Sequence, residues 1–306
     1  MAKKIKIGIP RAFLYYRNYV LWKNFFEGLG CNIVLSPFTN KEIIDNGKNY
    51  SVDESCLASK IYLGHVHYLS DKCDYILVPR ICNYGVEKRV CMKFNGIFDV
   101  VCNLFPNINV LNYDIDYLNS KYEIFGFIKM GFKITKNIFK IIYCYFSSKK
   151  KEKKHNFSLV RSQENILKSD KLKILIVSHP YVIYDYYLGD NIIEYLKEND
   201  IQILFSDRMN RKEAINYAKD FSKTLYWLYA RENIGSVMYY KNAVDGIIFL
   251  SSFPCGVDSL VNELVIRKLE DIPCINIILD ESTALAGLQT RLESFVDIIK
   301  ARRDNG

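Results

Sequence analysis

Nine cysteines are the residues of this 306-residue chain with the most distinctive chemistry, and one has an informative setting. Cys56 follows the polar run Ser51–Ser55 and precedes a helical pattern over residues 57–69. We therefore expect it in the first turn of a helix. There the unpaired backbone amides and the helix dipole stabilise a thiolate, the form of cysteine that binds metals. Cys56 is a candidate metal ligand on these grounds.

Three further cysteines follow apolar runs of the kind that form buried strands. Cys82 comes after residues 75–78, Cys91 lies on the same loop, and Cys255 comes after residues 246–250. Thiols on strand-end loops of two facing domains could converge on one soft metal centre. The alternative is that they are unrelated loop cysteines, and spacing alone leaves both readings open.

Other metal and nucleotide sites find no support in the sequence. No Cys-x-x-Cys pair and no His-Glu-x-x-His motif occurs, which speaks against zinc. Neither the dinucleotide-binding glycine pattern nor a phosphate-binding loop is present. Cysteines within or beside apolar runs read as small buried hydrophobes, and these are Cys31, Cys102, Cys144 and Cys274.

Two series of apolar runs must position the candidate residues. The predicted strands of the first series are residues 5–9, 32–35, 75–78 and 108–112, with an amphipathic helix at 13–29. Those of the second series are residues 173–177, 201–205, 246–250 and 274–279, with a helix at 191–197. Short apolar strands alternating with helices predict parallel sheets covered on both faces. The strands of the two series are offset by 168 to 172 residues, which suggests a duplicated unit.

We therefore predict an α/β protein with two Rossmann-like (flavodoxin-like) parallel-sheet domains that arose by internal duplication. The first domain covers residues 1–120, a basic helix and linker cover residues 121–170, and the second domain covers residues 171–306. Ligands of such sheets bind beyond the carboxyl ends of the strands, and a cleft is expected between two such domains.

The segment between the two halves carries most of the net charge. Residues 121–173 hold 14 Lys and Arg against 4 Asp and Glu, in a chain whose net charge is +8. Within a predicted helix at residues 123–146, four lysines are spaced to form one stripe: Lys129, Lys133, Lys136 and Lys140. The polybasic run at residues 149–154 follows. One interpretation is a packed helix with a solvated lysine face and then an exposed linker; the other is a helix for a membrane surface or an acidic partner.

Composition and charge distribution narrow the classes of protein further. Hydrophobic content of 49% and charged content of 25% are ordinary for a globular protein and exclude a disordered chain. The basic excess is confined to one segment, which argues against a nucleic-acid binder. No stretch has the length of a membrane span or of a secretory signal. An odd number of cysteines fits a reducing compartment, so we expect a cytoplasmic protein.

Short motifs in both halves match those of one protein family. They are Ile7–Arg11, Asp53–Leu57 with Lys60, Gly64 and His65, Val78–Arg80, Val90–Phe94, His179–Tyr181 with Tyr184 and Asp185, Phe253–Gly256, and Asp280–Glu281 with Gly287–Phe295. In these motifs the chain resembles the 2-hydroxyacyl-CoA dehydratase superfamily of anaerobes. Within it, the chain is similar to the acyl-CoA dehydratase activase-related branch, akin to the double-cubane cluster proteins. The resemblance covers residues 1–115 and 170–300 and misses the basic middle.

The resemblance implies two Rossmann-like domains that hold an iron–sulfur cluster, of [4Fe–4S] or double-cubane type, through three cysteines. Carried over residue by residue, the ligands would be Cys56, Cys91 and Cys255, with Cys82 as a candidate fourth ligand. The family also works with an ATP-dependent activase that drives electrons onto the cluster at very low potential. We expect that activase to be a separate chain.

The leading hypothesis is therefore an oxygen-sensitive iron–sulfur protein that accepts these electrons for reductive or dehydratase-type chemistry. The substrate would be an acyl-CoA or another small molecule, and a homodimer is compatible with this reading. Whether the chain is itself a reductase or a (R)-2-hydroxyacyl-CoA dehydratase-like lyase stays open. The alternatives are a cluster-free module that binds acyl-CoA or another anion, and a regulatory or scaffold partner of the activase.

Other residues of the matching motifs have both a functional and a structural reading. His65 and His179 could lie near the cluster or anchor a helix and a loop. Asp280 and Glu281 could bind substrate or cap the next helix. Three arginines could hold phosphate, contact an acidic partner or bridge two domains, and these are Arg11, Arg80 and Arg291.

Overall fold

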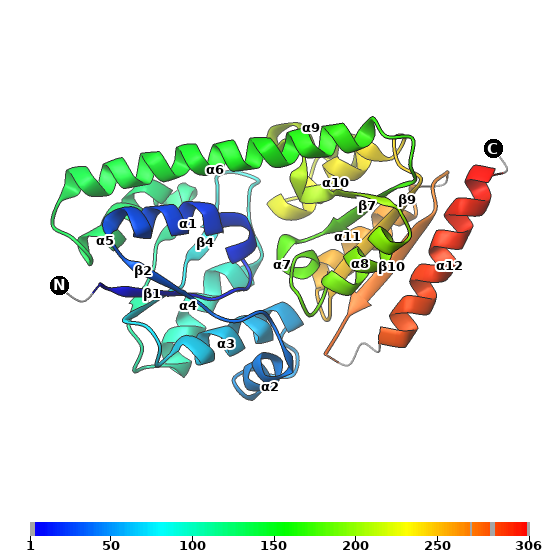
Figure 1. The fold of residues 1–306 in the computed structure, drawn as a ribbon. Coiled ribbons are helices and arrows are strands. Elements are labelled where there is room, and N and C mark those ends of the chain that lie inside the picture. Colours follow the sequence, from blue (N-terminus) through cyan, green and yellow to red (C-terminus); the bar gives the residue numbers. More distant parts are fainter. Residues whose placement is uncertain (1–3, 270, 282–284, 305–306) are drawn as a thin grey trace. The chain divides into compact units, whose positions relative to one another are not determined.

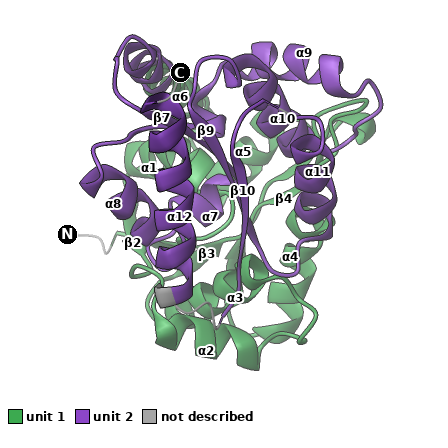
Figure 2. Ribbon diagram, turned by 90° about the vertical axis from the view of Figure 1, so that its right-hand side faces the viewer, with its two compact units in different colours: residues 1–156 green, residues 157–306 purple. Residues whose placement is uncertain are grey.

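The protein is represented by a computed structural model that describes residues 4–269, 271–281 and 285–304. The chain divides into two compact units, Met1–Asn156 (unit 1) and Phe157–Gly306 (unit 2), shown in Figure 2. Each unit contains its own parallel sheet with helices packed against it (Figure 1). The prediction of an α/β fold with parallel sheets is therefore confirmed.

Unit 1 is built on a four-stranded parallel sheet in the order β2-β1-β3-β5. Its strands are β1 (Lys6–Ile9), β2 (Asn32–Leu35), β3 (Tyr75–Leu77) and β5 (Val110–Leu111). In the register, Lys6 stands opposite Asn32 and Ile7 stands opposite Tyr75. Residues Ile7 and Ile9 are fully buried, as expected for a strand covered on both faces.

A second, two-stranded parallel sheet continues from the first. It pairs β4 (Arg80–Asn83) with β6 (Asp114–Asp116), and a short 3₁₀ helix follows at Tyr117–Asn119. Pro79, which has no N–H to donate, separates β3 from β4. The sequence-based prediction placed Cys82 on a loop, and this was wrong: Cys82 lies within β4.

The helices of unit 1 pack through large apolar side chains and, between α2 and α3, through close backbone contact. They are α1 (Tyr15–Leu29), α2 (Lys41–Asn49), α3 (Leu57–Leu69), α4 (Met92–Leu104), α5 (Glu123–Phe132) and the first half of α6 (Ile138–Leu167). On α1, buried Trp22 donates its indole N–H to the Tyr113 hydroxyl at 3.0 Å. Where α2 meets α3, a Cβ atom on Gly64 would stand 1.9 Å from the Ile43 carbonyl oxygen, so only glycine fits there.

The basic middle segment is two helices, and much of it is packed into unit 1. The chain turns between α5 and α6, where the Asn137 side chain accepts a hydrogen bond from the Lys140 N–H. Phe127 on α5 and Ile141 on α6 are fully buried. The single lysine stripe predicted for residues 123–146 is therefore interrupted by a turn.

Two of the stripe lysines have structural partners, and so do two lysines of the polybasic run, Lys149 and Lys151, of which Lys151 donates to Asn24 Oδ1 at 2.8 Å. Lys133 donates to the Val110 carbonyl oxygen at 3.1 Å, and Lys140 donates to the Leu29 carbonyl oxygen at 3.1 Å. Lys149 lies in ion pairs with Glu123 and Glu152. Residues 149–154 lie inside α6. The expectation of an exposed linker at these residues was wrong, because the helix continues through them.

Unit 2 is built on a four-stranded parallel sheet in the order β10-β9-β7-β8. Its strands are β7 (Lys173–Ser178), β8 (Gln202–Phe205), β9 (Gly246–Ser252) and β10 (Cys274–Leu279). Every residue of β9 is buried. When the strands of each four-stranded sheet are numbered along the chain, and the second sheet is read from β8, the order is second, first, third, fourth in both.

The helices of unit 2 cover both faces of its sheet. They are α7 (Pro180–Ile183), α8 (Asp190–Glu198), α9 (Arg211–Phe221), α10 (Leu228–Tyr240), α11 (Gly256–Ile266) and α12 (Leu285–Asp304), with a 3₁₀ helix at Ser206–Arg208. Side chains of α9, α10 and α11 share a buried cluster with Leu175 and Phe249. A Cβ atom on Gly246 would meet Ile299 of α12, so α12 packs closely against β9. Among the described residues, we find no helix with the length and apolar character needed to traverse a lipid bilayer.

Candidate functional site

The three cysteines predicted as cluster ligands all occupy the same kind of position. Cys56 is the N-cap residue of α3, Cys91 that of α4, and Cys255 that of α11. Their carbonyl groups accept the first helical N–H bonds, as in the 3.0 Å bonds from Phe94 to Cys91 and from Ser259 to Cys255. Each of these residues stands at a helix N-terminus, whose unpaired amides favour negative charge, although none of the three side chains makes a capping hydrogen bond. The sequence anticipated this setting for Cys56 alone.

Cys82 and Cys91 lie on either side of a short loop in unit 1. The Val90 N–H donates to the Cys82 carbonyl oxygen at 3.3 Å, and Asn83 forms an antiparallel bridge with Arg89. Gly85, with φ of 118°, provides the left-handed conformation that the intervening turn requires. The loop thus brings the backbone at Cys82 beside the residue that precedes Cys91.

In unit 2, Cys255 belongs to a small polar group at the carboxyl end of the sheet. Its thiol donates to the Asp258 carboxylate, and His179 Nε2 lies 3.0 Å from Asp258 Oδ1. Both His179 and Asp258 are buried, and the His179 ring stacks on Tyr181 with ring centres 5.0 Å apart. Burial alone would raise the pKa of Asp258, but His179 and the Cys255 thiol outweigh it and hold that pKa below its usual range.

Within the described residues, no three His, Cys, Asp or Glu side chains form a group that could hold a metal ion. Cys56, Cys82 and Cys91 belong to unit 1 and Cys255 belongs to unit 2. The donor chemistry at each position fits an iron–sulfur ligand, because thiolates are the usual ligands of such clusters. The assignment of Cys56, Cys91, Cys255 and Cys82 as ligands stays a prediction.

The other cysteines sit in settings that keep a thiol protonated. Burial raises the pKa of Cys31, Cys73 and Cys274 to about 11. Burial also raises the pKa of Cys102 and of Cys144. Buried, protonated thiols behave as small apolar side chains, so these five cysteines fit a packing role.

The histidine and arginine residues of the family motifs bind neighbouring parts of their own units. His65 is fully buried in α3 and its Nε2 lies 3.0 Å from the Thr39 hydroxyl oxygen. Arg11 donates to the Ser36 carbonyl oxygen at 2.7 Å. Arg80 pairs with Asp99, and Arg291 donates to the Asn276 carbonyl oxygen. These contacts favour the structural reading of each residue.

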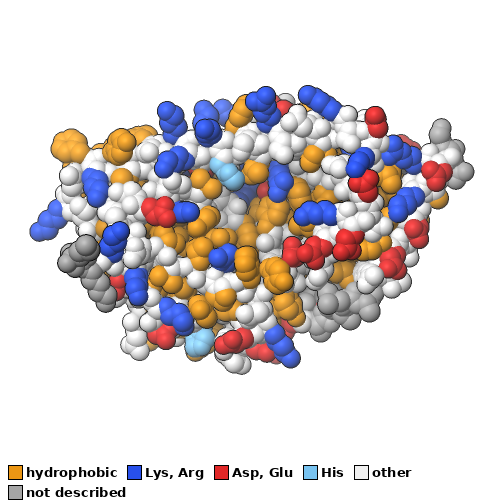
Figure 3. All heavy atoms as spheres, in the orientation of Figure 1, with side chains coloured by type: hydrophobic (Ala, Val, Ile, Leu, Met, Phe, Trp, Pro, Cys, Tyr) orange, Lys and Arg blue, Asp and Glu red, His pale blue; other side chains and the backbone are white. Residues whose placement is uncertain are grey.

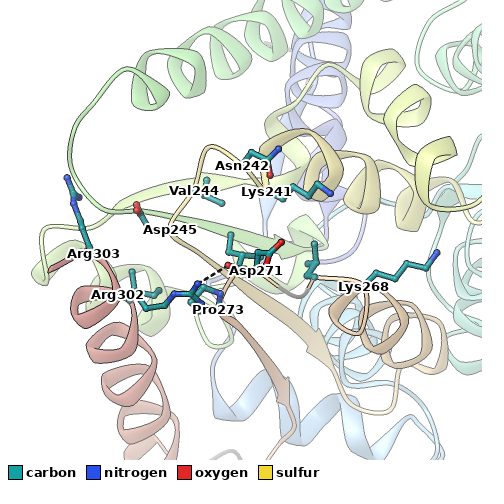
Figure 4. A pocket seen from close by; sticks show the side chains of 12 residues that line it. Lys241, Asn242, Val244, Asp245, Lys268, Asp271, Pro273, Arg302 and Arg303 are labelled. Carbon is teal, nitrogen blue, oxygen red and sulfur yellow. Dashed lines mark hydrogen bonds between the residues drawn. The ribbon is translucent and has the colours of Figure 1, made fainter. Parts of the chain in front are cut away.

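Two of the cavities in unit 2 differ in their surroundings. One of about 350 Å³ lies at the amino-terminal edge of the sheet and is lined by Lys268, Asp271, Arg302 and Arg303 among others (Figure 4). Three of the four cationic side chains there donate to backbone carbonyl oxygens: Lys268 to Phe221, Arg302 to Asp271 and Arg303 to Asp170. These three side chains therefore bind carbonyl groups at a helix end and in loops of their own unit, which favours a structural role for them.

The second cavity, of about 200 Å³, lies at the carboxyl end of β10. Asp280 lines it together with Tyr186, Tyr187 and Glu194. In parallel α/β sheets this edge is where ligands bind. Asp280 therefore stands where a substrate-binding residue would be expected, and its neighbours at residues 282–284 lie outside the described residues.

Asp258 is the site residue that sequence analysis missed. It stands three residues after the N-cap Cys255, a spacing at which an acidic side chain reaches back to the start of a helix. That spacing could have identified Asp258 as a candidate from the sequence. The contact between Asp258 and His179 could not have been predicted in this way, because 79 positions separate the two residues along the chain.

Comparisons with known proteins place this architecture in a family. No curated protein matches the sequence. A crystal structure of ZnuA aligns over 98% of this chain and 99% of its own chain, at 10% identity and a TM-score of 0.28, which carries no argument about function. The model of the CoA enzyme activase uncharacterised domain (DUF2229) matches residues 6–209, about two thirds of the chain. The chain therefore belongs to the family of the CoA enzyme activase uncharacterised domain.

Proposed function

We propose that this chain binds an iron–sulfur cluster through Cys56, Cys91 and Cys255 and receives electrons from a separate ATP-dependent activase. The observation that carries the proposal is that all three cysteines are N-cap residues, of α3, α4 and α11. Three scattered structural cysteines would have no reason to share that position. When bound, such a cluster supplies single-electron transfer at a potential set by charge, hydrogen bonding and solvent exposure.

Each protein group has a defined task in this proposal. The helix N-termini stabilise the negative charge that thiolate ligands bring. The Cys255 thiol donates its proton to Asp258, which also contacts His179, and it must lose that proton to bind iron as a thiolate. Cys82 lies beside the Cys91 loop and is a candidate fourth ligand.

We also propose the finer features that the family resemblance implies. The shared strand order of the two sheets supports an origin by duplication of one α/β unit. Membership in an activase-related family supports an activase as the partner. A cluster of [4Fe–4S] or double-cubane type, an acyl-CoA or other small substrate, a homodimer and a cytoplasmic location complete the proposal.

The decisive measurement is iron and acid-labile sulfide per chain after anaerobic purification and reconstitution. The proposal requires both at a fixed ratio to protein, and the iron-to-chain ratio separates one cubane from two. Absence of both under reconstituting conditions would reject the cluster and leave a cluster-free binding module or a regulatory partner.

Single substitutions test the ligand set. Cys56→Ala, Cys91→Ala and Cys255→Ala should each strip or destabilise the cluster, while far-ultraviolet circular dichroism shows both sheets still folded. Cys31→Ala is the matched control and should retain the cluster at a cost of about 1 kcal/mol of stability. Cluster loss in Cys82→Ala would make Cys82 the fourth ligand. Retention of iron in both Cys56→Ala and Cys255→Ala would refute the assignment.

A further inference from the structure

The first half of α6 exposes three large aromatic side chains. Phe139, Tyr143 and Phe146 are 83%, 72% and 57% exposed. They are spaced by four and three residues, so they lie on one face of the helix in successive turns. A face of this kind costs free energy in water, because apolar surface is left hydrated.

Lysines continue that same face toward the middle of the helix. Lys150, Lys153 and Lys154 follow Phe146 at spacings that return to the aromatic face, and all three are exposed. In the described part of the chain, none of their ammonium groups forms an ion pair with a carboxylate. The space-filling view shows hydrophobic side chains and Lys or Arg side chains exposed together where α6 begins (Figure 3).

The only two carboxylates between residues 121 and 160 are withdrawn from this face. Glu123 and Glu152 lie 2.9 Å and 2.8 Å from Lys149 Nζ and are only 16% and 13% exposed. The Tyr145 hydroxyl also donates to Glu123. The exposed lysines therefore keep an uncompensated positive charge beside the aromatic rings.

The opposite face of α6 is the one that packs against the rest of unit 1. Ile141, Cys144 and Ser148 are buried there, and Cys144 packs against Gly28 of α1. The aromatic and lysine face therefore does not contribute to the core of unit 1. Exposed aromatic rings beside unpaired lysines are typical of a binding surface.

We propose that this face of α6, from Phe139 to Lys154, docks on an anionic phospholipid bilayer. The aromatic rings at the start of this face can enter the apolar boundary of the bilayer. The ammonium groups of the lysines that follow can bind its phosphate groups. A single helix face is convex and has no groove to shape a protein partner, whereas a bilayer presents negative charge uniformly. The inference is independent of the cluster and of the activase.

The test is sedimentation of the full chain with vesicles. Vesicles of equimolar phosphatidylcholine and phosphatidylserine should bind it at low salt, and vesicles of phosphatidylcholine alone should not. Binding should weaken steeply with salt, because exposed charges are screened over about 10 Å at 0.1 M. The variant Lys150→Gln/Lys153→Gln/Lys154→Gln should lower the partition coefficient at least tenfold, since each lysine near an anionic surface contributes about fivefold.

Matched variants assign the binding to the proposed face. Phe139→Ser/Tyr143→Ser/Phe146→Ser should also lose at least tenfold, with an unchanged melting temperature. Tyr186→Ser/Tyr226→Ser and Lys212→Gln/Lys219→Gln/Lys223→Gln remove exposed residues of the same types from unit 2 and should bind as the wild type does. Failure of the wild type to bind, equal losses in the unit 2 variants, or binding to soluble polyglutamate instead of vesicles would each overturn the proposal.

Discussion

Burial fixes the charge state of His65. The side chain is fully buried in α3, and this burial, with a smaller contribution from Arg11, lowers its pKa from 6.5 to about 3. The folded protein therefore holds a neutral imidazole at any pH near neutrality. In the unfolded chain the same group takes up a proton near pH 6.5.

This difference predicts how stability depends on pH. Between pH 6.5 and 3 the unfolded state binds the proton and the folded state does not. The free energy of unfolding should therefore be unaffected by His65 above pH 6.5 and fall by about 1.4 kcal/mol per unit below it. Urea titrations across this range should show a shallower slope for His65→Gln than for the wild type. His155→Gln, at an exposed position, is the control, and an identical slope in His65→Gln would contradict the prediction.

Position 8 in β1 has room only for glycine because of one neighbouring atom, the sulfur of Cys73. A Cβ atom there would stand 2.5 Å from Cys73 Sγ but 3.5 Å from Cys73 Cβ. Gly8→Ala should therefore cost about 1–3 kcal/mol in the wild type through overpacking. In a Cys73→Ala background most of this cost should disappear, which a double-mutant cycle by chemical denaturation would measure.

A second glycine provides the control for that cycle. In α4, a Cβ atom on Gly96 would meet no heavy atom within 4 Å. Gly96→Ala should be neutral or stabilising, because alanine favours a helix by up to about 1 kcal/mol over glycine. An equal penalty at Gly8 with and without Cys73 would show that the backbone, not the sulfur, sets the requirement.

The continuity of α6 determines what its polybasic run tolerates. Residues 149–154 are part of one helix, so their deletion would turn the residues of α6 that follow by about 120° about the helix axis and place others on the face that packs in unit 1. Glu123, which is only 16% exposed, would lose its ion pair with Lys149, and Asn24 would lose the hydrogen bond that it accepts from Lys151. Deletion should therefore lower the melting temperature by several degrees. Lys150→Gln/Lys153→Gln/Lys154→Gln, which keeps the register, should leave it unchanged; a harmless deletion would contradict this account.

Strands were easier to predict from the sequence than helices. Buried parallel strands appear as short apolar runs between turn residues, and β2 and β10 match their predicted bounds. The break between α5 and α6 was missed because residues 133–137 contain neither glycine nor proline. Helix α10 gave no amphipathic signal, since even its Arg231 and Glu232 are buried.

The candidate site was predictable in its residue types but not in its contacts. The polar run before Cys56 was a readable helix start, so its N-cap position followed from local sequence. The pairing of His179 with Asp258 depends on β7 and β9 lying side by side, which no local pattern encodes. Long-range pairing of this kind needs the folded sheet.

At the scale of the whole molecule, the sequence predicts that ATP is consumed by a partner and not by this chain. No phosphate-binding loop occurs in either half. The purified chain should release no phosphate from ATP above the background of a mock preparation. Robust hydrolysis that survives further purification would contradict the assignment of the ATPase to a separate activase.

The two tryptophans of the chain fall one in each unit. Trp22 is buried and bonded to Tyr113 in unit 1, and Trp227 is the residue that precedes α10 in unit 2. Each unit thus contains its own intrinsic fluorophore. In Trp22→Phe or Trp227→Phe, the emission of the remaining indole reports on one unit alone, so the melting of the two units can be followed separately by fluorescence, without any added label.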